Sequence, residues 1–245
     1  MSRLAVVVPV YNEAAGIRPT LDALAAQYDG DFDAVFVDNG CTDDSVAIIE
    51  SYGQARWRVI NEPQKGTGAA ADTGMRAAIA AGAGLLARTD ADCIPRADWT
   101  AAIRRSLGRF ELVGGELVPR RDEGLNWATR ATLRGAVHVA EAFGRLRPGN
   151  RSSEYLGPYL MAAGCNVGIR SELYLAAGGF PRTKIEDLHE DRALVNAVRL
   201  LTSNYARRGD VVVYGSSRRV TAWGLKNTLL WYKDHAYRPD HVDIR

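Results

Sequence analysis

The amino-acid sequence predicts an α/β fold with a mostly parallel sheet, because strand and helix patterns alternate along its first half. Residues 4–10 and 34–38 form nearly continuous apolar runs, which are typical of strands buried on both faces. Between them, Ile17, Leu21 and Leu24 recur at the spacing of one helix face. Alternation of this kind predicts βαβ units, in which the strands run parallel.

Strands and helices are also expected in the rest of the chain. Further strands are expected over residues 57–60, 85–89, 112–118, 161–169 and 211–214. Further helices are expected after an N-cap at Thr42 or Asp43, over 68–82, 125–143, from Ser171, over 187–203 and over 224–236. Residues 144–160 are rich in Gly, Pro, Ser and Arg, which predicts a loop. No linker divides the sequence, so one domain is expected.

Composition excludes several classes of protein. The 245 residues include 31 basic and 29 acidic side chains, and this balance argues against a nucleic-acid partner. The three cysteines show neither disulfide-framework nor zinc-ligand spacing, which indicates reduced thiols. No apolar run approaches the roughly 20 residues that span a bilayer, and the one at the N-terminus is too short for a signal peptide. A cytoplasmic protein is expected, with peripheral contact at the inner membrane face left open.

Polar residues follow three of the predicted strands, where ligands bind in open parallel sheets. Tyr11-Asn12-Glu13, Asp38-Asn39 and Asp90-Ala91-Asp92 are expected to converge on one crevice. The helix start at 39–45 and the 65–68 loop offer backbone amides to an anion, and Lys65 adds a positive charge.

The two aspartates of the Asp90-Ala91-Asp92 segment are candidates for separate tasks. Alternate residues of an extended segment point in opposite directions, so one is expected to bind a metal ion and the other a ribose. Mg²⁺ or Mn²⁺ held with a nucleoside diphosphate needs only one or two protein carboxylates. In isolation the motif fits an acidic turn that caps a helix at least as well. Glu190 and Asp191 likewise fit either a dipole-favoured first turn or a general base.

Five segments in order resemble family 2 glycosyltransferases of the GT-A fold. They are VVVPVYNEAAGI, VFVDNGCTDDSVAII, NEPQKGTGAAADTGMRAAIAAGAGLLARTDADCIPRADW, GCNVGIRSELYLAAGGF and HEDRALVNAVR. The resemblance spans about residues 4–200 and implies a Rossmann-like three-layer sandwich with helices on both faces of the sheet. It also implies a nucleotide-sugar-binding half over about 1–118 and an acceptor-binding half over about 119–245.

The resemblance further implies roles for individual residues. Those at the donor are Pro9, Tyr11, Glu13, Asp38, Asn39, Lys65, Gly66, Asp90 and Asp92. Asn39 stands where the family usually has a base-reading Asp, and its carbonyl oxygen can accept the N3–H of uracil or thymine. Asp90 is implied to contact the ribose, and Asp92 to hold Mn²⁺ or Mg²⁺. On the acceptor side the implied residues are the base Asp191, Glu190 positioning the acceptor or base, and Asn166 facing the acceptor or donor sugar.

The implied reaction is inverting transfer of one sugar from a nucleoside-diphosphate sugar, with UDP- or dTDP-sugars favoured, to an unidentified hydroxyl such as a glycan or a lipid-linked acceptor. Where relatives often have a metal-binding His, this chain has VVVYGSSRRVTAWG, so Arg218 and Arg219 either contact the diphosphate or belong to a solvated face. Two alternatives stay open. A sugar-nucleotide pyrophosphorylase is disfavoured by PVYNE in place of a G-x-G-T-R loop, and a catalytically silent nucleotide-sugar-binding module is disfavoured by Asp92 and Asp191.

Overall fold

The structure of the protein is a computed structural model that describes residues 2–146, 150–182 and 190–232. The strands are β1 (Leu4–Val10), β2 (Phe32–Asp38), β3 (Trp57–Asn61), β4 (Leu85–Arg88), β5 (Ile94–Pro95), β6 (Leu112–Pro119), β7 (Val167–Arg170) and β8 (Tyr205–Gly215). The helices are α1 (Arg18–Ala25), α2 (Ser45–Ser51), α3 (Thr67–Ala80), α4 (Trp99–Leu107), α5 (Trp127–Leu146), α6 (Ser171–Ala176), α7 (Glu190–Arg199) and α8 (Arg218–Tyr232).

All the described strands join one sheet in the order β3-β2-β1-β4-β7-β6-β8-β5. Strands β3, β2, β1 and β4 are parallel, and β8 is parallel to β6. Strand β7 runs antiparallel to both β4 and β6, and the short β5 runs antiparallel to β8. The mostly parallel sheet is confirmed, and strands from both predicted halves of the chain share it.

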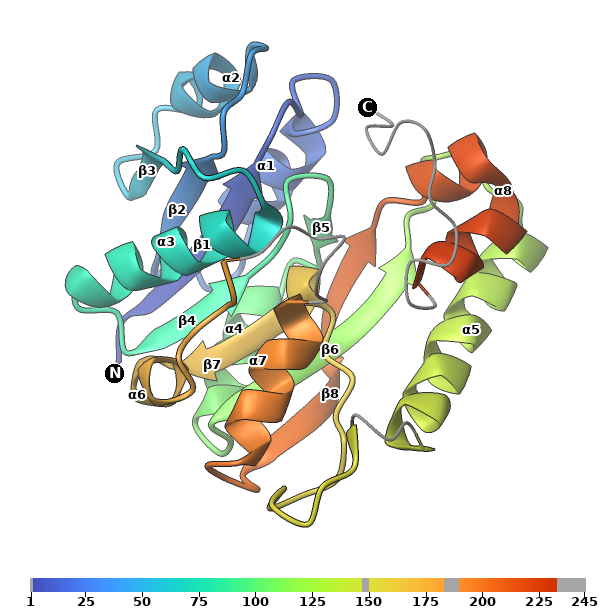
Figure 1. Ribbon diagram of the computed structural model, residues 1–245. Helices are drawn as coiled ribbons and strands as arrows, with labels where there is room; N and C mark the ends of the chain where they lie inside the picture. Colours follow the sequence, from blue (N-terminus) through green and yellow to red (C-terminus); the bar gives the residue numbers. More distant parts are fainter. Residues whose placement is uncertain (1, 147–149, 183–189, 233–245) are drawn as a thin grey trace.

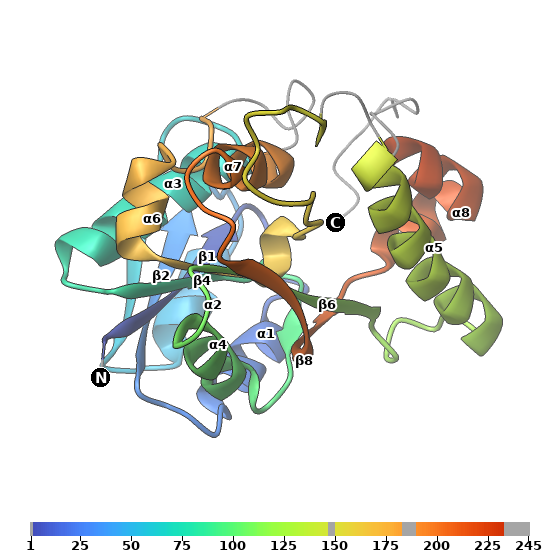
Figure 2. The same cartoon turned by 90° about the horizontal axis from the view of Figure 1, so that it is seen from below.

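Helices cover both faces of the sheet (Figures 1 and 2). Helices α1, α2 and α4 pack on one face through a cluster that includes Leu21, Ile49 and Trp99. Helices α3, α6 and α7 pack on the other face, where Met75 and Tyr174 are buried. The three-layer sandwich is therefore confirmed. Helices α5 and α8 lie side by side, outside the two helical layers and beyond the β6–β8 part of the sheet.

Several boundaries differ from those expected. The strand expected over 161–169 is only β7, because a 3₁₀ turn over Gly164–Asn166 interrupts it. Helix α7 ends at Arg199 rather than 203, and the start expected at 187 lies outside the described residues. Helix α8 begins at Arg218 and is kinked at Gly224, whose φ of 75° no helix interior adopts.

Helices α4 and α5 and strands β5 and β8 also differ from the elements expected from the sequence. Helix α4 and strand β5 were not expected, although Trp99, Ala102, Ile103 and Leu107 carry a helical apolar pattern. Helix α5 runs to Leu146, into the segment expected to be a loop. Strand β8 begins six residues before the expected 211, because its polar first half pairs with β6.

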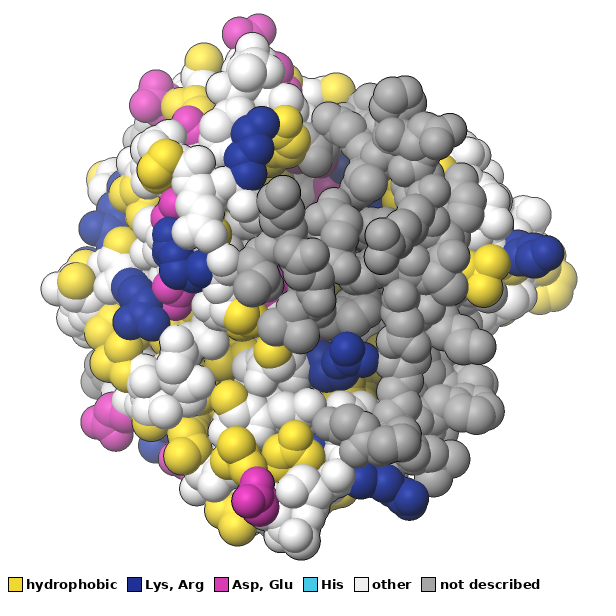
Figure 3. Space-filling view, viewed as in Figure 1, with side chains coloured by type: hydrophobic (Ala, Val, Ile, Leu, Met, Phe, Trp, Pro, Cys, Tyr) yellow, Lys and Arg dark blue, Asp and Glu magenta, His cyan; other side chains and the backbone are white. Residues whose placement is uncertain are grey.

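The described surface carries both signs of charge. On the face shown in Figure 3, basic and acidic side chains are interspersed over the part that is not grey. This pattern agrees with the near-balance of charge in the sequence. Within the residues that the structure describes, no helix combines the length and apolarity needed to cross a membrane.

Candidate active site

The two aspartates that follow β4 have different partners, as expected for alternate residues of an extended segment. Asp90 forms an ion pair with Arg88, at the end of β4. Asp92 forms an ion pair with Arg218, at the start of α8. Each arginine also contacts a second acidic residue, so the motif is bounded by two separate arginine–carboxylate groups.

Arg88 is the centre of the buried group. Its side chain is only 1% exposed; its Nε lies 3.2 Å from Asp90 Oδ1 and its Nη2 lies 3.4 Å from Glu190 Oε1. Its guanidinium carbon is 5.0 Å from the centre of the Phe180 ring. A Cβ on Gly164 would lie 3.1 Å from the guanidinium, so a larger residue there would crowd Arg88. Arg88 thus connects the segment after β4 to the start of α7.

Sequence reasoning did not single out Arg88. The available signal was an arginine at the end of the apolar segment Leu85–Arg88, directly before the acidic motif. Burial alone would lower the pKa of the guanidinium, but the charges of Asp90 and Glu190 raise it above its ordinary value. An arginine in such a place stays charged and needs acidic partners.

Asp191 lies in the first turn of α7, beside Glu190. Its Oδ2 accepts a hydrogen bond from the Gly164 N–H at 3.3 Å, and its Oδ1 accepts one from the Arg192 N–H at 2.6 Å. Burial, followed by the charge of Glu190, raises its pKa from 3.8 to about 6. A carboxylate with a pKa near the working pH is suited to accept a proton from a hydroxyl.

The arginine of the second group is closer to the solvent than Arg88, whereas Asp90 and Asp92 are about equally exposed, at 33% and 32%. Arg218 Nη2 lies 2.8 Å from Glu13 Oε1 and 3.2 Å from Asp92 Oδ2, and the exposed fractions of the Arg218 and Asp92 side chains are 28% and 32%. Glu13 comes from the turn after β1, Asp92 from the segment after β4 and Arg218 from α8. Side chains from distant parts of the sequence therefore meet at one edge of the sheet.

Four of the residues predicted to lie near the nucleotide come from neighbouring parts of the sheet. Lys65 Nζ lies 5.4 Å from the centre of the Tyr11 ring, so the turn after β1 contacts the loop before α3. Pro9 is paired with Val37 in the sheet, and Gly66 is the N-cap residue of α3. These four predicted residues thus lie at or near the carboxyl ends of β1, β2 and β3.

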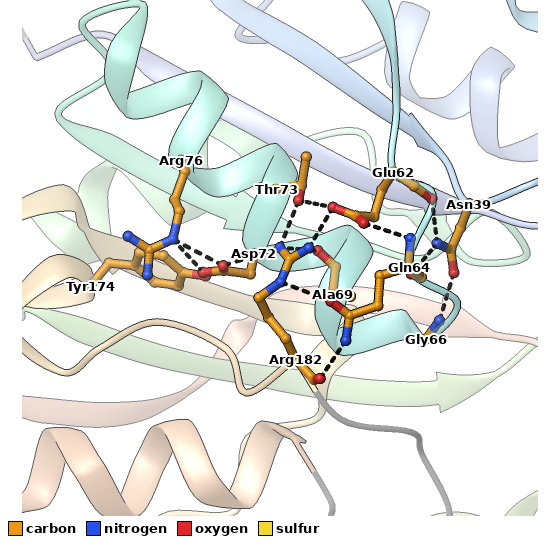
Figure 4. Close-up of polar contacts among 10 residues, drawn as sticks. All are labelled: Asn39, Glu62, Gln64, Gly66, Ala69, Asp72, Thr73, Arg76, Tyr174 and Arg182. Atoms are coloured by element: carbon orange, nitrogen blue, oxygen red, sulfur yellow. Dashed lines mark hydrogen bonds and ion pairs between the residues drawn. The ribbon is translucent and has the colours of Figure 1, made fainter.

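The Asn39 amide is engaged with the loop that leads to α3 (Figure 4). Its Nδ2 donates to the carbonyl oxygens of Glu62 and Gln64 at 2.9 and 2.8 Å, and its Oδ1 accepts from the Gly66 N–H at 2.9 Å. The side chain is almost fully buried. These contacts favour an indirect role for Asn39, which shapes the loop, over the expected contact with a base.

The amides of the 39–45 turn are likewise used within the chain. Asp38 Oδ1 accepts from the N–H groups of Gly40 and Cys41, and Asn12 Oδ1 accepts from that of Thr42. The Gly40, Cys41 and Thr42 amides are therefore used within the chain rather than offered to an anion. The reason is local, because Asp and Asn side chains compete for nearby backbone donors.

A network of charged side chains anchors the chain just before the undescribed segment that leads to α7 (Figure 4). Arg182 forms ion pairs with Glu62 at 2.8 Å and Asp72 at 3.5 Å. Asp72 also pairs with Arg76 and accepts a hydrogen bond from Tyr174. The loop before α3, α3 itself and the segment before α7 are thereby held together.

A close contact between helices adds to this anchoring. At Gly68, in the first turn of α3, an added Cβ would overlap the Pro181 carbonyl oxygen and lie 3.4 Å from Glu190 Cβ. The small residue therefore lets α3 approach the start of α7, which carries Glu190 and Asp191.

The Asn166 amide is used within the fold, which argues against the expected contact with acceptor or donor sugar. Its side chain is fully buried. Its Oδ1 accepts from Trp99 Nε1, and its Nδ2 donates to the carbonyl oxygens of Glu116 and Val211. Asn166 instead binds α4, β6 and β8 together, and it satisfies polar groups that would otherwise be costly to bury.

The described acidic residues can bind a divalent cation only if a ligand supplies most of the coordinating oxygens. Within the described parts of the chain, no group of three or more His, Cys, Asp or Glu side chains could hold an ion by itself. The partly exposed Asp92 carboxylate can supply one ligand, and diphosphate oxygens and water can complete the six that Mg²⁺ requires. The donor set therefore suits a metal that binds together with a nucleoside diphosphate.

A separate cavity of about 460 Å³ lies at the other end of α7. Its lining residues are Asn150, Arg151, Ser152, Ser153, Tyr155, Gly157, Pro158, Tyr159 and Arg199. The Arg199 guanidinium stacks on the Tyr155 ring at 3.9 Å and donates hydrogen bonds to Gly157 O, Asn150 O and Asn196 Oδ1. Eight residues of helix, about 12 Å, separate it from Asp191.

Comparisons with known proteins identify the class. Residues 5–174 match the sequence profile of glycosyl transferase family 2, and the chain belongs to this family. Glycosyltransferase AglE of Haloferax volcanii is 31% identical over 206 residues, which cover 81% of this chain and 63% of AglE. A PGL/p-HBAD biosynthesis glycosyltransferase of Mycobacterium bovis is 30% identical over 121 residues, which cover 47% of this chain and 46% of that protein. The matches thus span only part of these relatives.

Solved structures confirm the GT-A fold. The mannosyltransferase PcManGT of Pyrobaculum calidifontis, in complex with GDP-Man and Mn²⁺, aligns with a TM-score of 0.65 and 23% identity, covering 91% of this chain and 59% of that one. S. aureus TarS 1–349 in complex with UDP-GlcNAc aligns with a TM-score of 0.63 and 16% identity, covering 88% and 58%. Glucosyl-3-phosphoglycerate synthase of Mycobacterium tuberculosis, in complex with Mn²⁺, UDP and phosphoglyceric acid, aligns with a TM-score of 0.59 and 20% identity, covering 98% and 80%.

Proposed function

We propose that this protein transfers a single sugar, with inversion, from a nucleoside-diphosphate sugar to a hydroxyl acceptor, using Asp191 as general base. One observation carries the proposal. Asp191 has a pKa raised to about 6 and is held beside Glu190, which Arg88 connects to the segment that carries Asp92. A proton acceptor and the donor-binding edge are therefore joined by a buried ion-pair group.

The donor side is assigned to the carboxyl ends of β1, β2 and β4. Tyr11, Glu13, Lys65 and Asp92 converge there, and Asp38 and Asn39 shape the adjoining turn and loop. Structural neighbours bind UDP-GlcNAc, UDP or GDP-Man in the same fold. The proposed donor is a UDP- or dTDP-sugar. Support comes from the UDP species bound by TarS and by glucosyl-3-phosphoglycerate synthase, because the Asn39 amide is engaged within the chain.

Asp92 is proposed to hold Mn²⁺ or Mg²⁺ together with the diphosphate. When bound, the ion supplies positive charge that stabilises the departing nucleoside diphosphate. Lys65, in the loop before α3, is placed to add to that charge at the nucleotide. Asp90, which Arg88 holds by an ion pair, is proposed to contact the ribose.

On the acceptor side, Asp191 is proposed to accept the hydroxyl proton as the oxygen attacks the anomeric carbon. The Gly164 and Arg192 amides fix the orientation of its carboxylate. Glu190 is proposed to position the base, because its own carboxylate is tied to Arg88. The attacking oxygen and the leaving diphosphate must lie on opposite faces of the sugar for inversion to occur.

The substitution Asp191→Asn tests the proposal. It removes the proton acceptor but keeps the size of the side chain, so the rate of nucleoside diphosphate release from the donor should fall by about 10²–10⁴-fold. Donor affinity, measured by calorimetry, should stay within about twofold, because Asp191 does not lie on the donor side. Turnover of the unchanged protein should fall as pH drops below about 6, where Asp191 becomes protonated.

A matched control is Asp98→Asn, which alters an aspartate in a surface ion pair with Arg96. It should leave turnover unchanged. Retained turnover in Asp191→Asn would refute the assignment and leave Asp187, outside the described residues, as the next base to test. Loss of donor affinity in Asp191→Asn would contradict its place on the acceptor side.

A further inference from the structure

We propose that Arg218 is a built-in cation of the donor site, which neutralises Asp92 and Glu13 before the donor arrives and then binds the donor diphosphate. Arg218 would compete with a divalent metal for Asp92 when no nucleotide is present. It would also give the site an affinity for diphosphate that does not depend on metal. The role at the diphosphate rests on the proposed function, whereas the competition requires only that the Asp92 carboxylate can bind a divalent ion.

The geometry of the ion pairs points to this role. A single nitrogen, Arg218 Nη2, lies 2.8 Å from Glu13 Oε1 and 3.2 Å from Asp92 Oδ2. Burial alone would lower the pKa of this guanidinium, but Glu13 and Asp92 raise it above its ordinary value. The arginine is therefore charged at every working pH, and it occupies the Asp92 oxygen that would otherwise be open to a metal ion.

A diphosphate in this site would come within reach of the same guanidinium. If Asp92 and phosphate oxygens bound the same ion at about 2 Å each, the diphosphate would come within about 4 Å of an oxygen that Arg218 already contacts. The forked guanidinium matches phosphate geometry, and its charge-assisted hydrogen bonds are stronger than neutral ones.

The backbone that carries Arg218 is anchored on the same segment as Asp92. Glu123 accepts hydrogen bonds from the Ser216 hydroxyl and from the Ser217 amide and hydroxyl. Arg120 pairs with Glu123 at 3.5 Å and donates from its Nη1 to the Asp92 carbonyl oxygen at 3.0 Å.

Only the end of the Arg218 side chain therefore needs to change partners. Its Nε donates to Ser216 Oγ at 3.1 Å, which holds the stem, while its Nη2 contacts only the two carboxylates among the described residues. At 28% exposure the guanidinium is accessible from solvent, unlike Arg88 at 1%. A rotation of the guanidinium is enough to transfer it from carboxylate to phosphate.

The first test measures Mn²⁺ binding without nucleotide, by electron paramagnetic resonance of the free ion. The variant Arg218→Gln should bind Mn²⁺ about 3–10-fold more tightly than the unchanged protein, because Asp92 and Glu13 lose their competing cation. The control is Arg105→Gln, which removes a surface partner of Asp210 and should change nothing. Equal Mn²⁺ affinity in Arg218→Gln and Arg105→Gln would refute the competition.

The second test measures binding of UDP and GDP by calorimetry, in EDTA and in Mn²⁺. The unchanged protein should retain binding in EDTA, and Arg218→Gln should lose it by at least about tenfold there but by less in Mn²⁺. Arg218→Lys should recover part of the loss, because it keeps the charge without the fork.

The outcomes separate this inference from the proposed function. If the unchanged protein binds diphosphate only with metal, or if Arg218→Gln loses nothing in EDTA, the diphosphate role of Arg218 is refuted. If neither nucleotide binds under either condition, the proposed function itself fails, and the Mn²⁺ measurement still decides the competition for Asp92.

Discussion

The segment after β4 is bounded by two arginines that differ in burial. Arg88 bridges Asp90 and Glu190 with a side chain that is 1% exposed, whereas Arg218 bridges Asp92 and Glu13 with one that is 28% exposed. In a medium of low dielectric constant, an unpaired charge is far more costly than in water. The buried Arg88 therefore acts as a fixed frame, and the more exposed Arg218 can exchange its partners.

Each group also has a different position relative to the chemistry. Arg88 joins the segment after β4 to the helix that begins with Glu190 and Asp191. Arg218 lies at the proposed donor site itself. If the difference in burial decides the roles, substitutions at the two arginines should have opposite profiles, with a large loss of stability at one and altered ion binding at the other.

The largest effect is expected for Arg88→Met. It leaves Asp90 and Glu190 without their cation, and breaking a buried ion pair costs about 3–5 kcal/mol of unfolding free energy. Urea denaturation measures this loss. Adding Glu190→Gln to Arg88→Met should restore part of it, because one of the unpaired charges is removed. A loss below about 1 kcal/mol would place Arg88 with ordinary surface pairs and erase the comparison.

A smaller effect of opposite sign is expected for Asp191→Asn. The pKa of Asp191 is raised from 3.8 to about 6, so the folded state binds this proton more tightly than the unfolded state does. The resulting stabilisation is complete below about pH 4 and is lost as pH rises through about 6. Above pH 6, Asp191→Asn should therefore be more stable than the unchanged protein by about 1–3 kcal/mol.

Urea denaturation of both proteins at pH 5 and pH 8 measures this difference, which should grow with pH. The gain in stability should accompany the loss of turnover, as happens when a functional site holds a charge at a cost to the fold. If the difference in stability between the two proteins does not change with pH, Asp191 has an ordinary pKa in the folded state.

The smallest effect is expected for the stability of Arg218→Gln. The pair with the partly exposed Asp92 contributes only about 0–1 kcal/mol and is screened by salt, whereas the pair with Glu13, which is 10% exposed, contributes more. The midpoint of urea denaturation should therefore fall less than for Arg88→Met, and the difference from the unchanged protein should shrink between low and high salt. A loss as large as that of Arg88→Met would show that Arg218 holds the fold together rather than serving the ligand.

Much of the architecture followed from local patterns in the sequence. The apolar runs over 4–10 and 34–38 and the helix signal between them became β1, β2 and α1, because a segment buried on both faces has few other stable forms. Pro19 sits in the first turn of α1, as its missing N–H requires. The order of motifs likewise pointed to the family that the profile match over residues 5–174 confirms.

The sequence was less informative where a residue's role depends on distant partners. Asn166 and Asn39 looked like ligand-binding side chains, yet each uses its amide within the fold. Helix α4 carries an apolar helical pattern in Trp99, Ala102, Ile103 and Leu107, but it is short and directly follows a polar segment. Arg88 gave no signal beyond its place at the end of an apolar segment, because its partner Glu190 is 102 residues away in the sequence.

The sequence by itself therefore determined the strand and helix types, the parallel arrangement and the edge of the sheet where the acidic residues gather. These features depend on periodicity and on neighbours in the chain, which a sequence displays directly. Only the tertiary structure decided which cation faces which carboxylate. Burial and the separation of charged groups set both the pKa of Asp191 and the contrast between Arg88 and Arg218, and neither quantity exists until the sheet has assembled.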